Sequence, residues 1–135
     1  HSTSRRQRQM CIRDSFHIYA DNDRVAKQVA ALREGDFSTF LRLVNESGHS
    51  SWEYLQNVIP AGYKEHQEVA VTIAAAKHFL NGAGAVRVHG GGFAGTVQAF
   101  VPLEKLDAFK AEMEAILGAG KCHILSIRPE GGAVL

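Results

Sequence analysis

A glycine-rich turn between two short apolar segments constrains the fold of this chain more than any other feature. The segments cover residues 86–89 and 96–101, and four of the six residues from 90 to 95 are glycine. A simple hairpin turn needs about one or two glycines, and glycine also lets a backbone come very close to another group. The sequence therefore predicts a β-hairpin whose turn lies against a ligand or another loop. A bulged hairpin, in which glycine only relieves crowding, is the alternative.

The turn lacks the context of a nucleotide-binding fingerprint. Residues 90–95 formally match Gly-x-Gly-x-x-Gly, but that fingerprint requires a helix directly after the glycines. Here residues 96–101 continue as a strand, and no Gly-Lys-Ser/Thr sequence follows. We therefore expect neither a dinucleotide-binding motif nor a Walker loop.

Helical patterns surround the hairpin. Apolar residues at steps of three and four predict helices over residues 16–34, 36–44, 64–80 and 102–117. The apolar stripe of the first helix consists of Phe16, Tyr19, Val25, Val29 and Leu32. The polar residues 45–51 predict a loop, and the alternation in residues 122–127 predicts a last strand. This order favours an α+β fold, with a helical hairpin and further helices packed on one face of a small antiparallel sheet.

The composition is that of an ordinary globular domain. The 135 residues carry a formal net charge of +1 and are 45% hydrophobic, without a long apolar run. This composition favours neither nucleic-acid nor membrane binding. Cys11 and Cys122 have no metal-ligand or redox spacing, and the His, Asp and Glu residues form no metal-binding pattern. We therefore expect no metal site and a reduced, cytoplasmic setting.

Residues 1–15 differ from the rest of the chain. They contain four arginines, few apolar residues and no clean period, and position 1 is not Met. We expect a disordered or non-native leader before a domain that covers residues 16–135, in a fragment of something longer. A basic arm for nucleic acid is the alternative, although no aromatic residues alternate with the charges.

The turn resembles the third signature motif of the GHMP kinase superfamily, most closely that of galactokinases. There, Arg-x-(Thr) leads into Gly-Gly-Gly-Phe-Gly-Gly, and here residues 87–95 read Arg-Val-His-Gly-Gly-Gly-Phe-Ala-Gly. Three other segments resemble galactokinase motifs in the same order along the chain: residues 21–25, 35–49 and 126–133. Ala94 departs from the pattern, and so does the segment 50–58, which lies near the sugar pocket in the family.

The resemblance implies the C-terminal domain of a galactokinase, with a ferredoxin-like fold. Galactokinases transfer the γ-phosphoryl of ATP to the anomeric hydroxyl of galactose with Mg²⁺. Their phosphate-cradling loop and the Arg and Asp beside the sugar belong to the N-terminal domain, which this chain lacks. We therefore expect no catalytic residue here, no turnover by the chain alone, and contact with sugar and ATP only through a missing N-terminal domain.

The resemblance also implies which residues line the site. The turn against phosphates and sugar consists of Gly90, Gly91, Gly92, Phe93 and Gly95, and the cleft-lining candidates are Arg87, His89, Ser47 and His49. Each candidate also has a structural interpretation. Arg87 would be a surface charge, and His89 would only occupy a turn. Ser47 and His49 would lie in a loop whose side chains bond to the loop itself. A non-catalytic ligand-binding or dimerisation module of α+β type is the second function class. An RNA reader is disfavoured, because the hairpin has one cation and no ladder of aromatics.

Overall fold

A computed structural model of the chain describes residues 5–60, 62, 65–91 and 95–130. In these residues, four α-helices accompany one two-stranded sheet. The elements, in order, are α1 (Arg5–Arg33), α2 (Phe37–Ser50), the π-helical turn η1 (Ser51–Leu55), α3 (Glu68–Leu80), β1 (Ala85–Val88), β2 (Val97–Phe100), the 3₁₀ turn η2 (Leu103–Lys105) and α4 (Leu106–Leu117). The predicted α+β class and the predicted hairpin are confirmed. None of the helices in the described residues has the length and apolar character needed to cross a membrane.

The two strands of the hairpin are antiparallel, and their residues pair one to one. Val86 pairs with Ala99 and Val88 with Val97, so these four side chains share one face, because side chains alternate along a strand. Arg87 and its partner Gln98 lie on the other face. The backbone N–H of His89 donates to the carbonyl of Thr96 at 2.9 Å, which extends the ladder by one pair toward the glycine turn.

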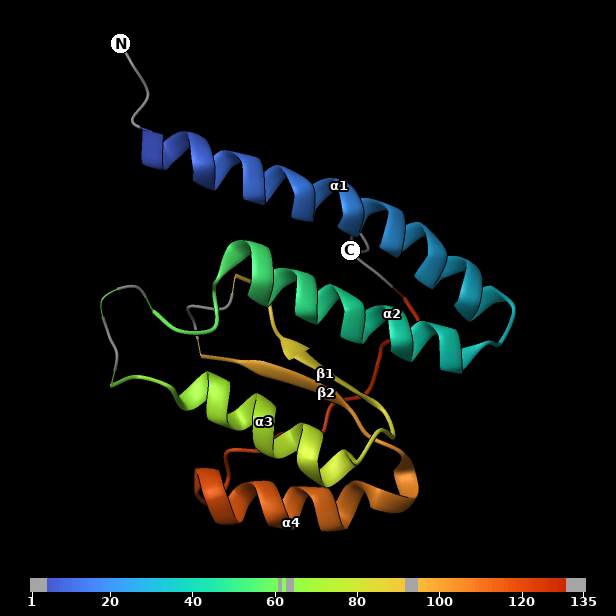
Figure 1. Cartoon of the computed structure of the whole chain (residues 1–135). Coiled ribbons are helices and arrows are strands. Elements are labelled where there is room, and N and C mark those ends of the chain that lie inside the picture. The colour runs from blue at the N-terminus through green and yellow to red at the C-terminus, as the bar shows by residue number, and fades with distance from the viewer. Residues whose placement is uncertain (1–4, 61, 63–64, 92–94, 131–135) are drawn as a thin grey trace, which may run out of the picture.

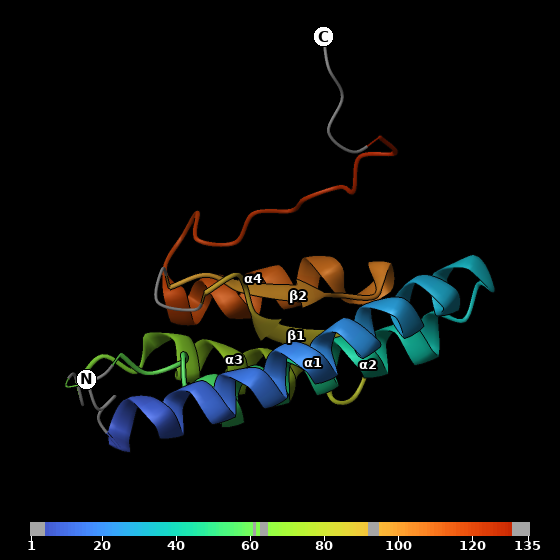
Figure 2. The ribbon, with the colours of Figure 1, turned by 90° about the horizontal axis from the view of Figure 1, so that it is seen from above.

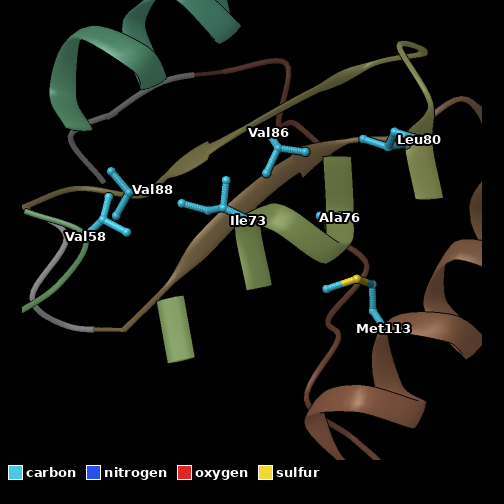
Figure 3. Close-up of a cluster of buried hydrophobic side chains, with 7 residues drawn as sticks. All are labelled: Val58, Ile73, Ala76, Leu80, Val86, Val88 and Met113. Atoms are coloured by element: carbon cyan, nitrogen blue, oxygen red, sulfur yellow. The ribbon is translucent and has the colours of Figure 1, made fainter. Parts of the chain in front are cut away.

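The apolar core lies on the Val86 side of the hairpin (Figure 3). The buried cluster consists of Val58, Ile73, Ala76, Leu80, Val86, Val88 and Met113. It joins α3, α4, β1 and the segment after η1. Ala76 is buried, and its small side chain lets α3 approach the strands closely, as the alanine-rich sequence of this helix suggests. Burying an aliphatic side chain contributes about 1.5–3 kcal/mol, so this cluster is the main source of stability on this side.

The helix α2 packs along β1 on the Arg87 side. A Cβ atom placed on Gly48 would lie 2.8 Å from Arg87 Cβ, so the helix approaches the strand more closely than any other residue type would allow. Asn45 also accepts a hydrogen bond from the Val86 N–H at 3.0 Å and donates to the Gly84 carbonyl at 3.3 Å. Figure 1 shows α1 and α2 on one side of the hairpin and α3 and α4 on the other. The sequence predicted helices on one face of the sheet, whereas the helices lie on both sides of the hairpin. The ferredoxin-like topology stays a prediction.

Two predicted boundaries are wrong on the N-terminal side. The segment 45–51, predicted to be a loop, belongs to α2 and η1. Its glycine is a contact point rather than a helix breaker, because Gly48 faces Arg87. The helix α1 begins at Arg5, inside the segment expected to be a disordered leader. Whether residues 1–15 are native to the protein stays a prediction, as does the domain boundary at residue 16.

The predicted last strand is also wrong. Residues 121–128 have no regular secondary structure, and Figure 2 shows this segment extending away from the helices and the hairpin. Its apolar side chains are exposed, with Leu125 at 87%. Alternation alone does not supply a neighbouring strand, and a strand forms only by pairing. The helices α3 and α4 follow their predicted ranges closely, with α3 beginning at Glu68 and α4 preceded by η2.

Candidate functional site

The described part of the glycine turn is exposed and open. Gly90 and Gly95 have φ angles of +61° and +76°, a conformation that side chains rarely adopt, so the backbone itself requires glycine at both positions. Gly91 has no positive φ, and no described atom lies within 4 Å of a Cβ built on it. The described residues therefore do not explain the missing side chain of Gly91. Gly92 and Phe93 lie outside the described residues, and so does Ala94.

Arg87 is half-buried and points toward α2. Its Nη1 donates to the hydroxyl of Ser47 at 2.6 Å, and its Nε donates to the Val88 carbonyl at 3.0 Å. These bonds hold the guanidinium against the protein. A role toward phosphate stays a prediction for this residue. The side chain of His89 is exposed, and the residue takes part in the hairpin through its backbone N–H.

Ser47 is the centre of a hydrogen-bonded group between α1, α2 and β1. Its side chain is 1% exposed, and its hydroxyl donates to Asp21 Oδ1 at 2.7 Å while it accepts from Arg87. The same Oδ1 accepts a bond from Arg24 Nε at 3.0 Å. Burial alone would raise the pKa of Asp21, but the hydrogen bonds from Ser47 and Arg24 outweigh it and hold that pKa below its usual range.

His17 completes this group from α1. The imidazole Nδ1 lies 2.9 Å from Ser50 Oγ, and Nε2 lies 3.9 Å from Asp21 Oδ2. Burial lowers the pKa of His17, and the charge of Asp21 opposes this shift only in part. The ring is therefore neutral at neutral pH. The polar cluster, as we call it, consists of His17, Asp21, Arg24, Ser47, Ser50 and Arg87.

The structure separates His49 from Ser47. The two residues are two positions apart on α2 and so face different directions. His49 Nε2 lies 2.9 Å from Lys77 Nζ on α3, and burial lowers the pKa of both groups. His49 also lines a shallow hollow of about 380 Å³ with Gly82 and Gly84. Gly84 precedes β1, whereas the glycine turn follows it, so this hollow lies at the opposite end of the strand.

Sequence reasoning missed two members of the polar cluster, His17 and Ser50. Asp21 and Arg24 entered only as part of a segment that resembles a galactokinase motif. A signal was available, because His17, Asp21 and Arg24 follow one another at steps of four and three on one helical face. The apolar stripe of the same helix drew attention instead. Among the described residues, no group of three His, Cys, Asp or Glu side chains is placed to hold a metal ion.

Comparison with known proteins points to one kind of enzyme. The chain is 30% identical over 91 residues to the galactokinase of Mannheimia succiniciproducens, which covers 67% of this chain and 22% of that protein. It is 35% identical over 107 residues to the galactokinase of Thermotoga petrophila, covering 79% and 27%. The match to the galactokinase of Thermotoga neapolitana is 35% over 103 residues, covering 76% and 26%.

These matches support a galactokinase-like relationship over part of the chain. The chain spans about a quarter of the length of the curated relatives that it matches. No family model matches the chain. No solved structure matches it either.

Proposed function

We propose that this chain is the C-terminal portion of a galactokinase-like sugar kinase, and that its glycine turn closes over the phosphates of ATP and the sugar. The observation that carries the proposal is Gly91, which lacks a side chain although neither its φ nor the described residues around it require glycine. A backbone without a Cβ leaves room for another molecule to approach closely. The similarity to galactokinases supplies the chemistry of that molecule.

The chemistry of phosphoryl transfer suits such a turn. Catalysis of this reaction rests on positioning and on stabilising charge at the phosphoryl oxygens. Successive backbone N–H groups at a turn can stabilise anionic oxygens. The described residues include no group of three His, Cys, Asp or Glu side chains that could hold Mg²⁺, and we assign its ligands to the part of the enzyme outside this chain.

We also propose that the chain alone does not catalyse phosphoryl transfer. The galactokinase relatives are about four times longer than the matched segment, and we assign the catalytic residues to the remainder. A coupled assay of ADP release with galactose and ATP measures this directly. Turnover by the chain above that of a boiled control would contradict the predicted inactivity. The cytoplasm is the setting that we propose for such an enzyme.

A chimeric enzyme tests the proposed relationship to galactokinases. The segment of Thermotoga neapolitana galactokinase that matches this chain is replaced by this chain, and ADP release is measured with galactose. We expect activity well above that of the same enzyme with the segment deleted, and we expect Gly91→Val to lower it sharply while Ala119→Val, in another exposed turn without a positive φ, does not. A folded chimera with no activity above the deletion would overturn the proposal.

A dimerisation module is the second candidate function. Apolar side chains of α1 are exposed, with Phe16 at 63% and Tyr19 at 73%. These residues lie three positions apart on one helical face and would become buried in a symmetric dimer. Light scattering of the chain distinguishes the two functions, since a dimer that Tyr19→Glu converts to a monomer would favour the module.

A further inference from the structure

We propose that Ser47 is a positioning residue for the glycine turn. Its hydroxyl links Asp21 on α1 to Arg87 on β1, and this link fixes the end of β1 that leads into the turn. The inference rests on the proposed function for its biological meaning, because it assigns a role at the same site. Its structural content stands on the contacts of the polar cluster.

The turn receives its placement from the strands. None of the described glycines in it, at positions 90, 91 and 95, has a described atom within 4 Å of the place where a Cβ would stand. At these three positions, the described residues leave open space beside the turn. The strands β1 and β2 carry the turn, and the last ladder bond before it joins the His89 N–H to the Thr96 carbonyl.

Ser47 is placed to hold the end of β1. A hydroxyl has one donor and two acceptor sites, and here the donor goes to Asp21 at 2.7 Å while an acceptor site receives Arg87 at 2.6 Å. Both bonds involve a charged group, and such bonds are roughly twice as strong as neutral ones. The guanidinium of Arg87 also donates to the Val88 carbonyl, one residue before His89. A continuous path of hydrogen bonds therefore runs from α1 to the base of the turn.

The polar cluster is suited to positioning rather than to stability. Burying charged groups is costly, and apolar side chains of similar volume often stabilise a fold as well or better. Arg24 Nη2 is buried and has no hydrogen-bond partner among the described residues, which is not an optimum for stability. Hydrogen bonds are directional, whereas apolar burial is not. The contact between α1, α2 and β1 thus specifies an orientation.

Hydrogen exchange on the 135-residue chain tests the proposal. The probe is the amide of His89, and the reference is the amide of Leu80 in α3, which reports on the core. We expect Ser47→Ala to speed exchange at His89 by about tenfold, the usual cost of leaving buried partners unsatisfied, with Leu80 unchanged. Asp21→Asn should act in the same direction, and the two changes combined should give less than the product of their effects, because both break one link.

Ser50→Ala is the matched control. It removes a buried hydroxyl from the same helix and the same cluster, but Ser50 bonds to His17 and not to β1. We expect exchange at His89 to stay unchanged in this variant. Should Ser47→Ala fail to fold, Asp21→Asn carries the test, since it keeps the shape of the side chain.

Three results would overturn the proposal: no change at His89 in Ser47→Ala and Asp21→Asn, an equal acceleration at Leu80, or an equal effect of Ser50→Ala. The readout needs no kinase activity. An inactive chimera combined with the expected exchange pattern would therefore contradict the proposed function alone, and the reverse combination would contradict the role of Ser47 alone.

Discussion

The two sides of the hairpin differ in how much of their buried contact is polar. On the side of α3 and α4, the contact is made of aliphatic side chains such as Ile73 and Val86. On the side of α1 and α2, the apolar residues Ala31, Leu43 and Val44 are buried too, but the contact also contains the polar cluster, and several apolar side chains of α1 are exposed. Buried apolar area stabilises without fixing direction, whereas hydrogen bonds fix direction and add little net stability. We therefore expect the first side to determine stability and the second to determine geometry.

The largest expected effect concerns the apolar side. Ile73→Ala should lower the free energy of unfolding by about 2–5 kcal/mol, because it removes buried methylenes and leaves a cavity among residues that cannot fully collapse. Urea denaturation followed by circular dichroism measures it. Val71→Ala on the same helix is the control, since Val71 is exposed, and its effect should stay within about 0.5 kcal/mol. Equal effects of the two substitutions would break the contrast between the sides.

The close approach of α2 to β1 gives the next effect. Gly48→Ala should lower the free energy of unfolding by about 1–3 kcal/mol through overpacking against Arg87, even though alanine favours a helix by about 1 kcal/mol. Thermal unfolding of the two proteins gives the difference. Gly91→Ala is the matched variant, because a Cβ there meets open space, and we expect no loss of stability. A Gly48→Ala variant as stable as the parent would show that the two elements do not touch as described.

A smaller effect should depend on pH. The pKa of His17 lies below its usual value of 6.5, chiefly through burial, with Asp14, Asp21, Arg24 and Arg87 as the neighbouring charges. The unfolded chain therefore binds a proton at a higher pH than the folded chain. The contribution of His17 to stability is complete above about pH 6.5 and is lost as the pH falls toward the lower, folded-state pKa.

Denaturation at pH 7 and at pH 5 measures this dependence. His17→Gln should make the fall in stability between these values shallower than in the parent. An unchanged slope in this variant would show that the polar cluster does not depend on a neutral imidazole.

The smallest effect lies outside both contacts. Arg42 and Glu46 form an ion pair on the surface of α2, and both side chains are largely exposed. Arg42→Ala should change the free energy of unfolding by no more than about 0.5 kcal/mol, because water and salt screen exposed pairs. A loss comparable with that of Ile73→Ala would mean that charge, rather than apolar area, stabilises this half of the molecule.

The sequence predicted the apolar side better than the polar side. The periodic residues of α3 and α4 and the short apolar segments of β1 and β2 predicted their elements, because buried side chains leave an apolar pattern in the sequence. The apolar pattern does not predict contacts that depend on a close backbone approach or on the direction of a hydrogen bond. Gly48 reads as a helix breaker in the sequence, yet α2 needs it to touch β1.

The predicted apolar stripe of α1 shows the same limit. Phe16 and Tyr19 have the spacing of a buried face but are exposed, while His17 between them is buried at 7% exposure. In the last predicted strand, Leu125 alternates correctly but has no neighbouring strand to pair with. The candidate site follows the same rule: the hairpin that carries the turn was predictable, whereas the links through Ser47 depend on three elements meeting in space.

The side-chain amide of Asn45 also affects the edge of the sheet. Its side-chain amide donates to the carbonyl of Gly84 and accepts from the N–H of Val86, as the peptide group of an adjoining strand would. The outer edge of β1 is thereby closed at its beginning by a single side chain. Exposed strand edges are templates for unwanted pairing with other chains. A helix that supplies one amide at this position therefore protects a short sheet from aggregation through β1 and keeps that edge from accepting a further strand.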